Sequence, residues 1–164
     1  MADERAPQTP SGRAWQATND DMQAIAGDRR ADGWTTTTMP AVHTSTVSRD
    51  TGEDDRFGLV HVIPGNHAED FVAAYEDHAF PEYLAYRRQV EFAVFLVIEH
   101  LDPDANHALL IACHYDARKA TGMVANARET GELYSYCQTL DGTLLGTFSY
   151  PDPAPLLPRG GESE

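Results

Sequence analysis

The chain has 164 residues, enough for one domain with its own core, and a formal net charge of -14. Hydrophobic residues make up 41% of it, which excludes an intrinsically disordered protein. The surplus of 26 acidic over 12 basic residues, with no basic helix face, argues against nucleic-acid binding, because a polyanion would be repelled.

The basic residues are also unusual in kind, since Lys119 is the one lysine among them. Many hydrated carboxylates and little lysine favour a protein adapted to molar salt, where a Debye length of about 3 Å screens self-repulsion. An acidic mimic of nucleic acid is the alternative. The opening MADERAPQTP has no apolar leader, and no apolar run is long enough for a membrane span, so we expect a cytoplasmic protein.

Both ends of the chain are rich in proline, glycine and charged residues. We therefore expect residues 1–10 and 151–164 to be disordered tails, and residues 11–150 to form a single domain. Within that domain, apolar residues at helical spacing predict a helix over residues 11–32. The β-branched run over residues 35–48 then predicts a strand, which Pro40 breaks or confines to a sheet edge.

A strand over residues 57–64 comes next. Asn66 and Glu69 have the spacing of a capping box, which predicts a second helix from Asn66 to about His78. A short strand is expected over residues 83–88.

The most apolar part of the sequence is the stretch over residues 91–116. Two β-type runs flank the turn formers of residues 102–106, which predicts an antiparallel hairpin. Both runs are almost continuously apolar, so we expect both faces to be covered and the hairpin to lie in the middle of a sheet.

The last third predicts one more helix and one more hairpin. Asp116 precedes the helix expected over residues 117–130 as its N-cap. The hairpin is expected over residues 132–150, and its Asp141-Gly142 pair suits a type I′ turn. The resulting order, α-β-β-α-β-β-β-α-β-β, predicts a single-domain α+β sandwich with a mostly antiparallel sheet of about five to seven strands and three helices.

Five separated strings, covering about Trp15 to Tyr150, resemble an uncharacterised domain family of halophilic archaea. They are RFGLVHVIPGNHA (56–68), EYLAY (82–86), YDARKATGMVA (115–125), GELYSY (131–136) and LDGTLLGTF (140–148). The resemblance implies a cytoplasmic protein of a salt-loving archaeon and implies no activity, so it identifies no catalytic residue. The element order also resembles that of roadblock-type scaffold modules, as an analogy of topology alone.

No nucleophile elbow, phosphate-binding loop or zinc-finger spacing occurs in the sequence, so we expect no catalytic residue and no cofactor. Cys113 and Cys137 lie in apolar runs, as two small buried hydrophobes or as a disulfide between neighbouring strands. Cys113 and His114 are adjacent in a strand, so they point to opposite faces and cannot form a dyad.

Two sets of residues are candidates for a site. His61, His114 and Asp116 form a two-histidine, one-carboxylate metal set if their strands are neighbours; hydrogen-bonded histidines at a sheet edge are the alternative. The second set is an anion site at the start of the third helix, with chance placement of the charges as its alternative. Its members are Arg118, Lys119, Arg87 and Arg88.

The sequence thus favours a non-enzymatic binding or regulatory module that self-associates through an uncovered sheet edge or a helix face. The alternative is a protein that binds a small anionic metabolite, or a metal-dependent enzyme that uses the neighbourhood of His61, His114 and Asp116.

Overall fold

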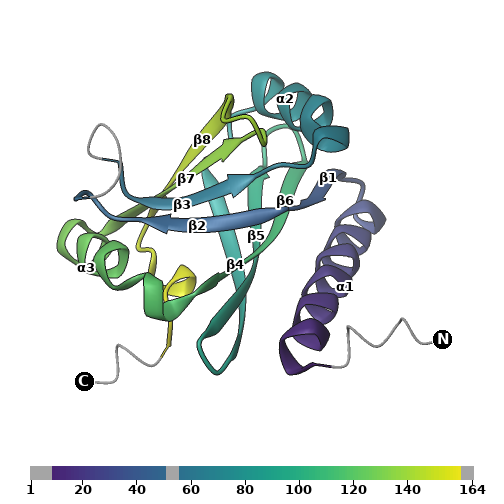
Figure 1. Cartoon of the computed structure of the whole chain (residues 1–164). Helices are drawn as coiled ribbons and strands as arrows, with labels where there is room; N and C mark the ends of the chain where they lie inside the picture. Colours follow the sequence, from purple (N-terminus) through teal and green to yellow (C-terminus); the bar gives the residue numbers. More distant parts are fainter. Residues whose placement is uncertain (1–8, 51–55, 160–164) are drawn as a thin grey trace.

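The structure is a computed structural model that describes residues 9–50 and 56–159. In this part of the chain, three α-helices pack on two four-stranded sheets (Figure 1). The helices are α1 (Pro10–Ala31), α2 (Ala68–Asp77) and α3 (Thr121–Thr130), with short 3-10 turns η3 (Gly65–His67), η4 (Ala117–Lys119) and η5 (Ala154–Leu156). The strands are β1 (Thr35–Pro40), β2 (His43–Val47), β3 (Gly58–Val62), β4 (Glu82–Val90), β5 (Ala93–Asp102), β6 (His107–Asp116), β7 (Glu132–Gln138) and β8 (Leu144–Pro151).

We call the two sheets sheet A, with strand order β1-β6-β5-β4, and sheet B, with order β2-β3-β7-β8. Each sheet has one parallel pair, β1 with β6 and β3 with β7, and its other pairs are antiparallel. The predicted class, a mostly antiparallel α+β sandwich with three helices, is confirmed.

The described strands number eight rather than five to seven, because the β-branched run after α1 serves both sheets. The backbone N–H of Ala41 still donates to Ala112 in sheet A, whereas that of Val42 donates to Val62 in sheet B. Pro40, which has no N–H for a ladder, ends β1 at this crossover. The run is therefore broken at Pro40, and both of its halves are edge strands, as predicted.

The hairpin of β5 and β6 occupies the middle of sheet A, also as predicted. Its pairing is continuous from Ala93 with Asp116 to Asp102 with His107. One face packs on sheet B, and the other is covered by α1, which lies along sheet A in Figure 1. The buried stripe of α1 consists of Ala14, Thr18, Met22 and Ala26.

The chain does not leave the fold after Tyr150, so the tail predicted over residues 151–164 is wrong for its described part. Leu156 and Leu157 are buried in the core between the sheets. The Arg87 guanidinium donates to the carbonyls of Ala154 (3.1 Å) and Leu157 (2.7 Å), which satisfies this non-helical backbone. At the other end, Thr9 caps α1 and Pro10 begins it, so these two residues of the expected tail 1–10 are also part of the fold. Residues 1–8 and 160–164 lie outside the described residues.

Several local signals were also misread. Helix α2 follows the turn η3 and has no side-chain cap, so the capping box of Asn66 and Glu69 does not form. The Asp116 carboxylate accepts from the N–H of Arg118 and caps η4 rather than α3. In the last hairpin Gly142 has φ 92° but Asp141 is not at positive φ, which excludes a type I′ turn.

Truncation of the central hairpin should be costly. Leu110 is fully buried under α1, so Leu110→Ala should lower the free energy of unfolding by about 2–5 kcal/mol. Leu140 is 85% exposed, so Leu140→Ala should change it by less than about 0.5 kcal/mol. Urea denaturation measures both variants, and equal losses would show that β6 is not central to stability.

Candidate functional site

The structure does not bring the proposed metal set together. His61 lies on β3 in sheet B, buried between the sheets, whereas His114 lies on the opposite, outer face of sheet A beside Trp15 of α1. Asp116 instead forms a two-point ion pair with Arg118. Across residues 9–50 and 56–159, no group of three or more His, Cys, Asp or Glu side chains could hold a metal ion.

His61 belongs instead to a chain of hydrogen bonds that crosses the core. Its Nδ1 lies 2.9 Å from Thr44 Oγ1, and its Nε2 lies 3.1 Å from Ser135 Oγ. The Ser135 and Tyr150 hydroxyls are 2.8 Å apart, and the Tyr150 hydroxyl is 2.7 Å from His100 Nε2. All of these side chains are buried, so the chain links sheet B to β5 of sheet A through polar contacts within an apolar core.

The position of each proton in this series of hydrogen bonds follows from its last member, His100. His100 Nδ1 lies 2.9 Å from the carbonyl of Leu109, which can only accept, so Nδ1 carries the proton. In the neutral ring Nε2 is then an acceptor, and the Tyr150 hydroxyl donates to it. Ser135 therefore donates to Tyr150, and His61 Nε2–H donates to Ser135. With Thr44 donating to His61 Nδ1, each bond of the chain has one proton and both histidines are neutral.

Burial sets the charge state of these histidines. It lowers the pKa of His61 to about 3, helped by repulsion from His100. It also lowers the pKa of His100 to about 4, partly offset by the hydrogen bond to Leu109. Both rings are therefore neutral near pH 7, as the bonding pattern requires.

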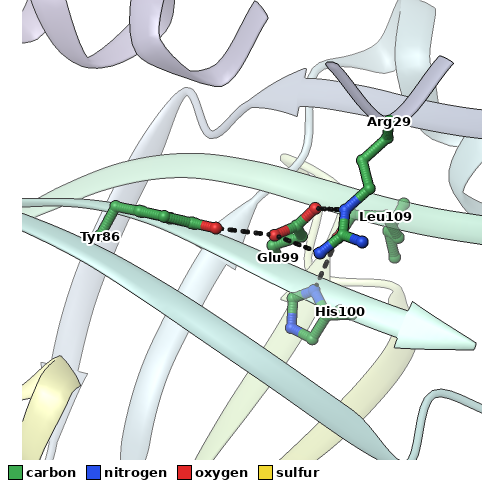
Figure 2. A network of polar contacts seen from close by, with 5 residues as sticks. All are labelled: Arg29, Tyr86, Glu99, His100 and Leu109. Atoms are coloured by element: carbon green, nitrogen blue, oxygen red, sulfur yellow. Dashed lines mark hydrogen bonds and ion pairs between the residues drawn. The ribbon is translucent and has the colours of Figure 1, made fainter. Parts of the chain in front are cut away.

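Glu99, the residue before His100, points to the other face of sheet A and binds helix α1 there. Glu99 is fully buried, and its carboxylate accepts from Arg29 Nε of α1 (2.7 Å) and from the Tyr86 hydroxyl of β4 (3.0 Å), as Figure 2 shows. The hydrogen bond to Glu99 raises the pKa of Arg29, and burial and the charge of Glu99 raise the pKa of Tyr86 to about 12. This ion pair holds α1 in register on sheet A. The Glu99 carboxylate is buried, whereas the Arg29 side chain remains 25% exposed.

The proposed anion site is not assembled either. Arg87 and Arg88 point to opposite faces of β4, where Arg87 binds backbone carbonyls and Arg88 pairs with Asp21 of α1 at 2.6 Å. The charge of Arg118 is offset by Asp116. Lys119 is exposed at the end of η4, next to Arg118. Because Arg87 and Arg88 are bound to different partners on opposite faces of β4, the four cations do not converge on one point.

Three of the predicted site residues do meet at a surface cavity of about 630 Å³, which we call the aromatic cavity. It lies between the start of α1, the turn from β4 to β5 and the end of β6. Its walls include the predicted His114, Asp116 and Arg118, joined by Trp15, Phe92 and Phe95.

The side chains of this cavity form an ordered aromatic cluster. The Trp15 and His114 rings meet edge to face with centroids 4.9 Å apart, and the Phe95 ring lies 5.3 Å from His114 and 6.5 Å from Trp15, so the three rings contact one another. Phe92 is 53% exposed at the tip of the β4–β5 hairpin, and the Arg118 guanidinium lies 4.7 Å above its ring. Its neighbour Glu91 has φ 54°, a left-handed conformation that costs a residue with a Cβ and that persists here at the cavity rim.

Partial burial also makes His114 an uncharged member of this cluster. Desolvation lowers the pKa of His114, and repulsion from His43 lowers it further. A neutral imidazole offers one donor and one acceptor beside the indole of Trp15. The cavity therefore combines flat apolar walls with a few polar groups, the usual composition of a small-molecule site.

A second, more polar hollow of about 530 Å³ lies between α2 and β1. Three histidines line it, and two of them have side-chain partners: His78 Nδ1 lies 3.1 Å from Asp102, and His107 Nε2 lies 2.9 Å from Thr37. The third is His67. Burial and the nearby His78 lower the pKa of His107. Its lining also includes Asp70 and Asp77, and it contains no tryptophan, phenylalanine or tyrosine, unlike the aromatic cavity.

Sequence reasoning missed the polar centre of the core and two walls of the cavity. Glu99 and His100 are the two polar residues within an otherwise apolar run, AVFLVIEHL, and that interruption was the available signal. Trp15 is one of the apolar residues whose spacing predicts the first helix, and nothing in that pattern places Phe92 beside it. Cys113 and Cys137 are buried and not disulfide-bonded, and Cys113 and the exposed His114 lie on opposite faces, as predicted.

These features define a two-sheet α+β protein with a closed polar core and an aromatic surface cavity. The chain belongs to a family of unknown function, DUF7529, whose family model matches residues 2–158. No curated protein and no solved structure matches the chain. No helix in the described part of the chain is long and apolar enough to cross a membrane.

The neutral histidines predict a loss of stability in acid. Both folded-state pKa values, about 3 and about 4, lie below the value of about 6.5 in the unfolded chain, so the unfolded state takes up protons first. The stabilisation is complete above about pH 6.5 and is lost as the pH falls towards those values. Each histidine contributes a slope of up to about 1.4 kcal/mol per pH unit there, measurable by urea denaturation. Imidazole NMR should show His61 as the Nε2–H and His100 as the Nδ1–H tautomer; titration of either near pH 6.5 in the folded protein would contradict this account.

Proposed function

We propose that the protein is a non-enzymatic binding module that holds a small molecule with a flat, apolar body in the aromatic cavity. The observation that carries this proposal is the arrangement of Trp15, Phe95 and His114, with ring centroids 4.9 to 6.5 Å apart around one hollow. Such separations suit edge-to-face and offset contacts, which a planar ligand can extend. The volume of about 630 Å³ falls within the range of small-molecule sites.

The charges around the cavity favour a ligand without a net negative charge. Asp116 offsets Arg118, and Glu91 adds a further carboxylate to the wall. The polar contacts available to the ligand are then the His114 ring and the hydroxyl of Ser11 at the start of α1. We therefore prefer a neutral ring system to the anionic metabolite that the sequence suggested, and binding to metal-dependent catalysis, since the metal set is not assembled.

We further propose that the protein works in the salt-rich cytoplasm of a halophilic archaeon. The support is compositional: a net charge of -14 and Lys119 as the one lysine. Molar salt screens the repulsion among such carboxylates, which dilute buffer leaves in place.

Ligand binding can be tested with the chain's two tryptophans. A panel of planar aromatic and heteroaromatic fragments, titrated at high KCl, should quench the fluorescence of Trp15 in the Trp34→Phe variant and give no site-specific quenching in the Trp15→Phe variant. Trp34 lies under Arg29 at the other end of α1, so it is the matched control. His114→Ala should weaken the best fragment by about tenfold, since one aromatic wall is lost. The cavity is not a binding site if no fragment binds, or if His114→Ala binds equally well.

Salt should control stability. We expect the melting temperature, followed by circular dichroism, to fall when the protein is moved from molar KCl to dilute buffer, because the acid surplus is then unscreened. Sucrose at matched osmolarity is the control for general exclusion effects. A melting temperature that is insensitive to KCl would contradict salt adaptation.

A further inference from the structure

Strand β4 is the longest of the four edge strands in the described part of the chain. It lies at the end of sheet A, is nine residues long and contains neither proline nor lysine. Its pairing with β5 runs without a register shift from Glu82 with Leu101 to Val90 with Ala93. Long, regular edges of this kind present a row of backbone groups to another strand.

The other three edges of the two sheets are blunted within the described residues. Strand β1 ends in Pro40, and β2 has only five residues. Strand β8 is covered by α2, since the Tyr75 hydroxyl donates to the carbonyl of Thr147 and accepts from its N–H, both at 3.2 Å. The contrast singles out β4 as the edge that is open to a partner.

The side chains of β4 identify the partner. Every second residue of the strand lies on the outer face of sheet A, the face on which α1 packs. These residues are Glu82, Leu84, Tyr86 and Arg88. Leu84 and Tyr86 are 46% and 39% exposed, although they lie in the middle of the strand. An acid at one end, a base at the other and apolar groups between them make this face complementary to itself in the antiparallel direction.

We propose that two copies of the chain pair through β4 in antiparallel fashion, with Ala85 opposite Ala85 on the two-fold axis. In this register Glu82 faces Arg88 of the second copy, and Leu84 faces Tyr86, each twice by symmetry. A shift of the register that places Tyr86 opposite itself sets Leu84 against Arg88 and Glu82 against Val90. A shift that places Leu84 opposite itself sets Glu82 against Tyr86. Only the Ala85-centred register matches both the charges and the apolar groups.

The product is one continuous eight-stranded sheet, β1-β6-β5-β4 followed by the same strands of the second copy in reverse. Both α1 helices then lie on the same face, because the two-fold axis is perpendicular to the sheet. Arg88, now paired with Asp21 and 44% exposed, keeps N–H groups for the second copy's Glu82. Pairing removes the open edge and covers Leu84 and Tyr86, which explains why these two apolar side chains are exposed in the single chain.

Sedimentation equilibrium of the full chain, in dilute and in molar salt, tests the association. We expect a dimer whose dissociation constant rises by at least about tenfold in Leu84→Asp, because both symmetric contacts with Tyr86 are lost. Leu140→Asp is the matched control: Leu140 is an 85% exposed leucine away from β4, so this change should leave the dimer intact. A chain that is monomeric throughout, or equal weakening by both variants, overturns the proposal.

Single cysteine substitutions test the register of the pairing between the two β4 strands, independently of charge. Opposed residues in antiparallel strands have Cα atoms about 4.5–5.5 Å apart, within disulfide range. Ala85→Cys should therefore cross-link to a dimer under mild oxidation faster than Leu84→Cys does. The native Cys113 and Cys137 are buried and should not contribute. Faster cross-linking of Leu84→Cys, or of neither variant, shows that the Ala85-centred interface does not form.

Discussion

The burial of β5 and β6 on both faces is the constraint on which the rest of the structure depends. A hairpin this apolar is stable only if each of its faces is covered, and two different devices do so: α1 on one side and sheet B on the other. The chain must therefore supply a helix before the hairpin and a second sheet around it. The crossover after Pro40 meets that demand, because it lets one β-branched run contribute an edge strand to each sheet.

Two adjacent residues of β5 fix both coverings in place. Glu99 points to α1 and binds Arg29, while His100 points to sheet B and begins the chain that ends at Thr44. Apolar contacts are not directional, so they would tolerate a helix or a sheet that slides by one residue. Buried hydrogen bonds do not tolerate such a shift, because leaving a buried polar group unpaired destabilises the folded state. The polar residues of the apolar hairpin thus specify one arrangement of the layers.

The proposed functional surfaces lie where these coverings stop. Helix α1 begins beside the β4–β5 turn and leaves the aromatic cavity between Trp15, Phe92 and His114. It also leaves the outer face of β4 partly bare, where Leu84 is exposed. Both features follow from a helix that covers the middle of sheet A and not all of it.

The sequence by itself determined the elements and their class. Helical spacing located α1, the two apolar runs located the central hairpin, and the turn formers separated them. These signals are local, since each depends on residues close together in the chain. Local reading failed where a distant contact decides. Leu156 and Leu157 looked like part of a tail, because the core that buries them includes distant strands: the hydroxyl of Tyr115 on β6, which donates to the carbonyl of Leu156, lies 41 residues earlier in the chain.

The site residues show the same division. His61 and His114 are both in strands, as expected, but which sheet holds each strand and which face each ring takes are matters of pairing between distant segments. Only the tertiary structure therefore separated His61 from His114, and only it placed Trp15 against His114. The physical reason is that a strand's sequence fixes the alternation of its two faces, whereas the partner that covers each face is chosen by packing across the whole chain.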